Sequence, residues 1–170
     1  MALRNWTEAD ADALIAPLNE PEIARWTRVP SPYTRADAGD FFARMRARLT
    51  SGEELSLAIV SISTGELLGS IALRVGWENR RGELGYLVFA PARGRAVATR
   101  AVRLLARFGF ERLGLGRIEI LAATANPASQ RVAEKAGFTR EGVLRSYMQS
   151  GGERLDMVSF SLLPDELDAA

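Results

Sequence analysis

The sequence contains no cysteine and no histidine. The lack of cysteine excludes disulfides and thiolate nucleophiles, and the lack of both residues excludes Cys/His zinc sites and a Ser-His-Asp triad. Lysine occurs only once, at Lys135. Any proton transfer must therefore use carboxylates, tyrosine or serine hydroxyls, water or this single lysine, and we expect no metal site.

Long apolar runs and an excess of one charge are also missing. No run reaches the roughly 18 apolar residues typical of a membrane-spanning helix, and the opening MALRNWTEAD lacks the apolar stretch of a signal peptide. We therefore expect a cytoplasmic protein without a membrane partner. Because 22 basic residues nearly balance 21 acidic ones, no large positive field attracts nucleic acid, and we expect no nucleic-acid partner.

What is present fits a single domain over residues 1–170, with a hydrophobic content of 47%. Its first third is predicted to be helical. Thr7 caps a helix over residues 8–16 that Pro17 interrupts, a short helix follows through 23–26, and Thr34 caps a longer one.

The rest of the chain alternates between strand and helix patterns. The helix over 97–112 carries an apolar stripe formed by Val97, Ala101, Leu104, Leu105 and Phe108. The remaining predicted elements are strands over 55–60, 67–75, 83–89 and 117–124, a helix over 127–136, and a closing hairpin of 138–149 and 154–163.

Two of these strands flank the longest predicted helix. A strand–helix–strand crossover makes 83–89 and 117–124 parallel neighbours, since such connections return to the same sheet in the same direction. The other connections are short turns typical of antiparallel pairs. We therefore expect an α/β sandwich built around a mixed sheet.

The segment FAPARGRAVATR, which joins the strand 83–89 to the helix 97–112, is typical of an anion site. Gly94 can adopt positive φ, and the free N–H groups of the first helical turn converge where the helix dipole is positive. Small residues and arginines complete a possible phosphate cradle: Arg93, Arg95, Ala96, Ala98 and Arg100. The alternative is an ordinary turn with solvated arginines. The segment matches neither a Walker loop nor the GxGxxG pattern.

The same segment resembles motif A of the GNAT superfamily of N-acetyltransferases, which binds the pyrophosphate of acetyl-CoA. A second, independent segment, TANPASQRVAEKAGF (124–138), resembles the Asn-x-x-Ser…Glu-Lys-x-Gly-Phe segment of that superfamily. Further matches are LRNWTEADADAL, TGELLGSIAL, GELGYLVF and EGVLR. Their order along nearly the whole chain is similar to the Rim-type branch, which includes acetyltransferases of ribosomal-protein N-termini.

This resemblance implies a fold and a cosubstrate. The fold is of the α/β (α+β) class: a mixed, mostly antiparallel twisted sheet with a splayed central parallel pair, flanked by helices. Acetyl-CoA would lie between the splayed strands, where the backbone groups of Leu87, Val88 and Phe89 are expected to be unpaired. The implied cofactor-binding residues are Leu87, Val88, Phe89, Arg93, Gly94, Arg95, Ala96, Val97, Ala98, Thr99, Asn126, Ser129 and Lys135.

Three positions depart from the family pattern. Ala96 stands where the motif usually has its first glycine, a departure that a right-handed helical conformation at this position would tolerate. Many superfamily members carry a tyrosine acid at the position of Ala133, and some Rim-type enzymes have a carboxylate at the position of Met148. The absence of the tyrosine leaves Ser129 or water as the proton donor, and the absence of the carboxylate argues against a mechanism and substrate like those of the ribosomal-protein enzymes.

The implied reaction is direct attack of an amine on the thioester of acetyl-CoA. Glu83 is the candidate base, directly or through water; alternatively it binds the cationic amine, or forms a surface salt bridge with Arg80 or Arg81. Asn126 and Ser129 complete the catalytic set. Asn126 holds a water or a pantetheine amide, or only caps the next helix. Ser129 either donates to the thiolate or only binds the cofactor.

The acceptor is predicted to be a small-molecule amine or a protein N-terminus. The residues implied to line its site are Trp26, Tyr33, Glu83 and Tyr147. For Asp156, on the closing hairpin, a structural role is favoured over a catalytic one. That hairpin is also a possible homodimer contact. The competing hypothesis is a CoA-binding sensor or partner module without turnover.

Overall fold

A computed structural model describes residues 1–150 and 152–167 of the chain. Its strands are β1 (Ala2–Asn5), β2 (Glu54–Val60), β3 (Leu67–Gly76), β4 (Arg81–Val88), β5 (Arg117–Ala123), β6 (Thr139–Ser150) and β7 (Glu153–Leu162). Its α-helices are α1 (Ala11–Leu18), α2 (Pro21–Trp26), α3 (Arg35–Thr50), α4 (Val97–Glu111) and α5 (Pro127–Lys135).

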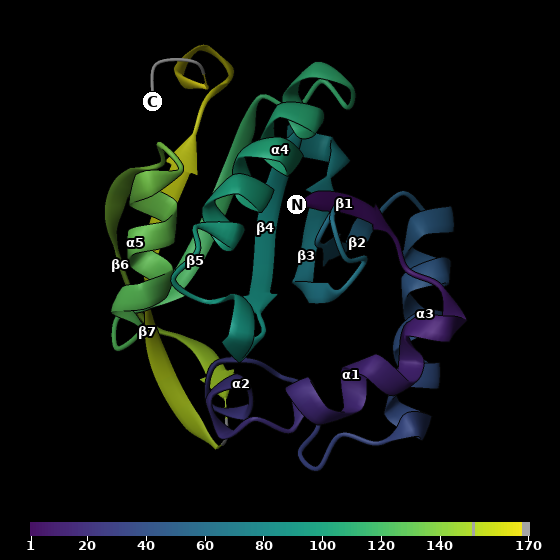
Figure 1. Ribbon diagram of the computed structural model, residues 1–170. Helices are drawn as coiled ribbons and strands as arrows, with labels where there is room; N and C mark the ends of the chain where they lie inside the picture. Colours follow the sequence, from purple (N-terminus) through teal and green to yellow (C-terminus); the bar gives the residue numbers. More distant parts are fainter. Residues whose placement is uncertain (151, 168–170) are drawn as a thin grey trace.

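The strands form one seven-stranded sheet in the order β1-β2-β3-β4-β5-β7-β6. Among the described strands, β4 and β5 make the parallel pair and all other neighbours are antiparallel. The crossover through α4 joins the two parallel strands (Figure 1). The expected mixed, mostly antiparallel sheet with one parallel pair is therefore confirmed.

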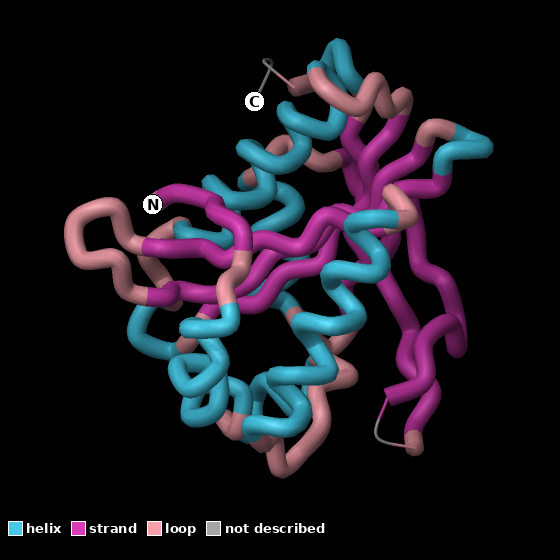
Figure 2. The backbone as a smooth tube through the Cα atoms, turned by 90° about the vertical axis from the view of Figure 1, so that its right-hand side faces the viewer, coloured by secondary structure: helices cyan, strands magenta, loops and turns pink. Residues whose placement is uncertain are grey.

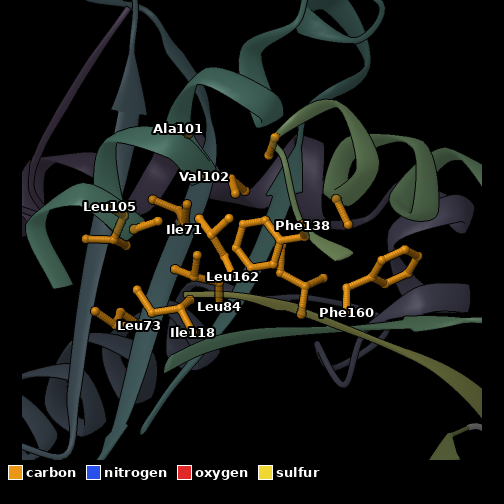
Figure 3. Packing of buried hydrophobic residues seen from close by; sticks show 14 of the residues in the cluster. Ile71, Leu73, Leu84, Ala101, Val102, Leu105, Ile118, Phe138, Phe160 and Leu162 are labelled. Carbon is orange, nitrogen blue, oxygen red and sulfur yellow. The ribbon is translucent and has the colours of Figure 1, made fainter. Parts of the chain in front are cut away.

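Helices cover both faces of this sheet (Figure 2). On one face α4 and α5 pack over the central strands, where Val102, Leu105, Ile118 and Phe160 are buried in the larger core (Figure 3). On the other face α1, α2 and α3 pack over β1 and β2, with a second core that includes Phe42. The hairpin of β6 and β7 reaches beyond the rest of the sheet (Figure 2).

The packing of α4 explains why one side of the expected stripe is buried. Ala101 and Leu105 are buried against the sheet, whereas Leu104 and Phe108 of the same apolar stripe are 48% and 39% exposed. Gly109 lies so close to β5 that an added Cβ would stand 2.8 Å from Ile118 Cδ1. The close approach at this glycine sets which face of α4 contacts the sheet. Leu104 and Phe108 lie outside this contact and remain partly exposed.

The central parallel pair separates soon after it begins. Backbone pairing of β4 with β5 runs from Arg81 opposite Arg117 to Glu83 opposite Glu119 and then stops. Beyond that point β4 continues to Val88 while β5 stays paired with β7, and the two strands diverge towards the bottom of Figure 1. The expected splay is therefore present, and it opens a gap between the strands.

Two expectations for the N-terminal third are wrong. Residues 2–5 form β1, which pairs with β2, instead of belonging to a helical region. Pro17 lies inside α1, which continues to Leu18. A proline in the last turn removes one backbone hydrogen bond but does not have to end the helix before it. None of the helices in the described ranges has both the length and the apolarity needed to cross a bilayer.

Candidate active site

The end of β4 forms one edge of the gap. Only some of the backbone N–H and C=O groups at this end are available to a ligand. The N–H of Phe89 donates to Leu68 O at 2.9 Å, and its carbonyl accepts from Ala92 N–H at 2.9 Å. Hydrogen bonds alternate along an antiparallel pair, so Leu87 is bonded to its partner Ser70 on β3. The expectation of unpaired backbone groups is therefore wrong for Leu87 and Phe89.

Val88 is the residue of this group that faces the gap. It lies opposite Gly69 in the pair without hydrogen bonds, so that its N–H and C=O point away from β3. The carbonyl accepts a hydrogen bond from Arg93 Nε at 2.9 Å. The N–H of Val88 points to where β5 would continue the ladder, and it can donate to a ligand between the strands.

The loop between β4 and α4 turns in two left-handed steps. Gly94 has φ 72°, as expected, and Ala96 has φ 55° and ψ 22°. The right-handed conformation considered for Ala96 is therefore wrong. A left-handed conformation costs an alanine about 1–2 kcal/mol, which is the physical reason for a glycine at this place in the motif. No side chain caps the helix at Ala96, so the first N–H groups of α4 remain available to a ligand.

The three arginines near this loop have different roles. Arg93 forms ion pairs with Glu20 at 2.8 Å and Glu22 at 3.4 Å, and so ties the loop to the start of α2. Arg95 and Arg100 are exposed and pair with no carboxylate in the described ranges. The positive charge available to an anion at α4 therefore comes from Arg95 and Arg100, because Arg93 is already paired with carboxylates at the start of α2.

The start of α5 holds two predicted site residues, Asn126 and Ser129. It brings them close to Tyr86, which the sequence analysis did not single out. Asn126 caps α5, and its Oδ1 accepts from Ser129 N–H at 3.0 Å. Ser129 Oγ lies 3.0 Å from the hydroxyl of Tyr86, which also donates to Ser129 O at 3.1 Å. Burial raises the pKa of Tyr86 to about 12. The available signal for Tyr86 was its position between Glu83 and Val88 in GELGYLVF.

Glu83 lies on the opposite face of β4 from Tyr86, at the last position where β4 and β5 pair. Its carboxylate is 34% exposed and accepts from Arg74 Nη1 at 2.8 Å. The expected alternatives of Arg80 and Arg81 are wrong. Arg81 pairs with Glu119, and Arg80 donates to a backbone carbonyl.

Paired charges continue across this face of the sheet. Arg117 contacts Glu119 at 2.7 Å and also Glu141, whose oxygen accepts from Ser161 at 2.9 Å. The hydrogen bond from Arg117 lowers the pKa of Glu141 to about 2, against the opposing effect of burial. In the described ranges, no group of three or more acidic side chains is arranged to hold a metal ion.

The predicted acceptor residues are placed differently from one another. Tyr33 is only 5% exposed and packs in the core beneath α1 and α3, so it offers little surface to an acceptor. Trp26 is partly buried at the end of α2, with the Arg25 guanidinium 4.6 Å from its ring centre. Tyr147 is 54% exposed on β6. Lys135 is exposed in the last turn of α5, away from Ser129 at its start.

Asp156 has a visible structural contact. Its carboxylate accepts from Ser146 N–H at 2.6 Å, and its carbonyl accepts from Thr124 N–H at 2.9 Å. Ser146 has φ 52° and lies where the β6–β7 register shifts, between Leu144 and Met148. Asp156 therefore holds this bulge and joins the closing hairpin to the end of β5.

The family model of the acetyltransferase (GNAT) domain matches residues 1–139. The chain belongs to the GNAT acetyltransferase family. It is 30% identical to an uncharacterized N-acetyltransferase, p20 of Bacillus licheniformis, over 168 residues, which cover 98% of this chain and 94% of the relative.

Two of the solved structures that are similar to this GNAT protein illustrate the relationship. A putative ribosomal-protein-serine acetyltransferase from Vibrio cholerae has a TM-score of 0.84 at 25% identity, covering 95% of this chain and 92% of that one. The microcin C7 self-immunity acetyltransferase MccE, solved with acetyl-CoA and AMP, has a TM-score of 0.86 at 22% identity, covering 95% and 91%. The first supports the Rim-type branch, and the second supports the fold.

Membership of this family makes the protein an acetyl-CoA-dependent N-acetyltransferase. The residues around the gap fit acetyl-CoA. Val88 offers a backbone N–H between the strands, and the start of α4 offers uncapped N–H groups beside Arg95 and Arg100. The backbone donors can bind the amide groups and the diphosphate of acetyl-CoA, and the positive charge complements the diphosphate.

Proposed function

We propose that this N-acetyltransferase acetylates a primary amine by direct attack on the thioester, with the pantetheine arm of acetyl-CoA held between β4 and β5. The observation that carries the proposal is the end of pairing at Glu83 and Glu119, followed by a Val88 N–H that faces the gap. The diphosphate then belongs at the start of α4. The arrangement separates the two substrates, since Glu83 lies on the face of the sheet opposite to α4 and α5, the helices assigned to the cofactor.

Val88 is assigned to the acyl donor. Its N–H can bond to pantetheine or polarise the thioester carbonyl, where a fixed donor stabilises the charge that develops during attack. The bond from Arg93 to the Val88 carbonyl holds this peptide unit in place. Holding both reactants in position can itself contribute several kcal/mol to the lowering of the barrier.

Glu83 is assigned to the acceptor amine. The attacking amine must be neutral, and a carboxylate at the point where the strands part can accept its proton, directly or through water. Its present partner Arg74 also contacts Glu54 at 3.1 Å, so Arg74 keeps an ion pair when the acceptor takes its place on Glu83. An exposed pair of this kind costs little to exchange.

Ser129 is assigned to the leaving thiolate. A serine hydroxyl is a much weaker acid than a thiol, so we assign it a hydrogen bond to the sulfur, with the final proton taken from solvent. Asn126 sets the first turn of α5 and so the position of Ser129. The absence of a tyrosine at position 133 is consistent with this simpler arrangement.

The acceptor is proposed to be a protein N-terminus or a small-molecule amine. The resemblance to a ribosomal-protein-serine acetyltransferase supports the first. The described carboxylates next to Glu83, those of Glu54 and Glu119, are already paired with arginines, so this part of the surface offers a polyamine no unpaired acidic cluster. A single amine on a largely neutral acceptor fits this balance best.

The test is acetyl-CoA turnover, measured by thiol release, over a panel of N-terminal peptides, amino sugars and polyamines. The proposal expects acetyl transfer to at least one acceptor, with mass spectrometry showing the gain of one acetyl group on its amine. Binding of CoA without thiol release for every amine would instead favour a non-catalytic sensor or partner module.

A further inference from the structure

A hydrogen-bonded pair of hydroxyls bridges the gap on the cofactor side of the sheet. Tyr86 comes from β4, one arm of the gap, and Ser129 from the first turn of α5, which follows the other arm. Their oxygens are 3.0 Å apart. The two residues are 43 positions apart in the chain, so this contact exists only because the strands part and α5 folds back over the opening.

Packing alone does not explain the phenol at this position. Tyr86 is surrounded by the apolar residues of the larger core, among which Leu84 is buried. A phenylalanine would fill the same space without removing a hydroxyl from water, which has a cost unless that hydroxyl finds a partner. The partners that Tyr86 finds are both on Ser129, the carbonyl and the side-chain oxygen.

The hydroxyl hydrogens available to Tyr86 and Ser129 limit which of the two donates the hydrogen bond between them. Ser129 Oγ carries one hydrogen and can also accept. Because burial raises the pKa of Tyr86 to about 12, the phenol stays protonated at neutral pH and acts as a donor. The phenol has a single hydrogen, and both Ser129 O and Ser129 Oγ lie within its reach. When that hydrogen goes to Ser129 Oγ, the serine hydrogen is released from Tyr86 and can be donated to another acceptor.

We propose that Tyr86 is a positioning residue for acetyl transfer, whose hydroxyl holds Ser129 Oγ so that the serine hydrogen points to the leaving sulfur. This inference rests on the proposed function of the site. No covalent step passes through Tyr86. The amine–carbonyl bond forms, the carbon–sulfur bond breaks, and Tyr86 only fixes the donor that stabilises the departing thiolate.

The experiment compares Tyr86→Phe, Ser129→Ala and the double variant in steady-state kinetics. Loss of one oriented hydrogen bond predicts about a tenfold lower kcat for Tyr86→Phe. We expect the KM for acetyl-CoA and the Kd for CoA to change less than about twofold, since the proposal assigns Tyr86 no contact with the cofactor. The double variant should be no slower than Ser129→Ala, because both changes remove the same interaction.

Controls separate positioning from a general loss of structure. Thr50→Ala removes a hydroxyl at the far end of α3, where it bonds to Arg46 O, and should leave kcat unchanged. Unchanged kcat in Tyr86→Phe, additive losses in the double variant, or a Kd for CoA weakened about tenfold would each overturn the inference. Absence of thiol release by the unaltered protein with every amine overturns the proposed function and this inference with it.

Discussion

At the scale of single residues, Ala96 shows how a motif residue is set by backbone conformation. Its φ of 55° lies in the left-handed region, directly before the first turn of α4. Glycine reaches this region without strain, whereas alanine does not. The glycine that the family usually has at this position is therefore explained by the turn itself, in addition to close approach of the diphosphate.

We expect Ala96→Gly to stabilise the protein. Relief of about 1–2 kcal/mol of strain is set against the roughly 0.5–1 kcal/mol that a glycine loses in backbone entropy, which leaves a gain of up to about 1.5 kcal/mol. Urea unfolding measures it. Gly94→Ala is the matched control and should lower stability, because Gly94 has φ 72° and nothing within 4 Å that a methyl group could pack against. A lower unfolding free energy for Ala96→Gly would refute this account of the loop.

Glu83 gives the second prediction at this scale. Glu83→Gln keeps the shape of the side chain but cannot accept a proton, so kcat/KM at neutral pH should fall by about 10²-fold or more. The dependence of the rate on pH should change as well, because one proton acceptor is lost. Glu66→Gln, an exposed change in the turn before β3, is the control. An unchanged rate and pH profile would remove Glu83 from the role of base.

At the scale of elements, ion pairs join parts of the fold that backbone hydrogen bonds do not join. Arg93 ties the loop before α4 to α2 through Glu20 and Glu22. Arg117 on β5 reaches Glu141 on β6, across β7, which lies between them. The first contact positions the N-terminal helix α2 relative to the central gap, and the second positions the closing hairpin.

The Arg117–Glu141 contact predicts a dependence of stability on pH. The pKa of Glu141 falls from 4.5 to about 2 on folding. A depressed carboxyl pKa contributes stability that is fully present above the unfolded value and is lost as pH falls towards the folded value. Glu141→Gln should therefore be less stable than the unaltered protein at pH 7, and the difference should shrink from about pH 4.5 down to pH 2. Urea midpoints at several pH values measure this, and a constant difference would contradict it.

At the scale of the whole molecule, local patterns predicted more than long-range contacts. The strand–helix–strand unit around α4, the capped helix after Thr34 and the closing hairpin all follow from periodicity and turn residues. The four residues of β1 are too few to show alternation, and they become a strand only by pairing with β2. The outer face of the helical stripe at Leu104 and Phe108 could not be told from the inner one by spacing alone.

The features of the candidate site also fall into those that the sequence predicted and those that depend on long-range contacts. The loop around Gly94, the cap at Asn126 and the placement of Glu83 at the parting strands follow from sequence and family resemblance. Three features depend on the folded register and were not predictable: which of Leu87, Val88 and Phe89 faces the gap, the commitment of Arg93 to α2, and the pairing of Tyr86 with Ser129. The roles of these residues in catalysis stay predictions until they are measured.

The central claim is that the start of α4 and the gap beside Val88 hold coenzyme A through its diphosphate and pantetheine arm. Isothermal titration calorimetry with CoA and with pantetheine, which lacks the diphosphate, tests this most directly. The account predicts a dissociation constant for CoA in the micromolar range, with much weaker binding of pantetheine and a loss of CoA affinity in the double variant Arg95→Gln/Arg100→Gln. Absence of heat with CoA, or equal affinity for CoA and pantetheine, would contradict it.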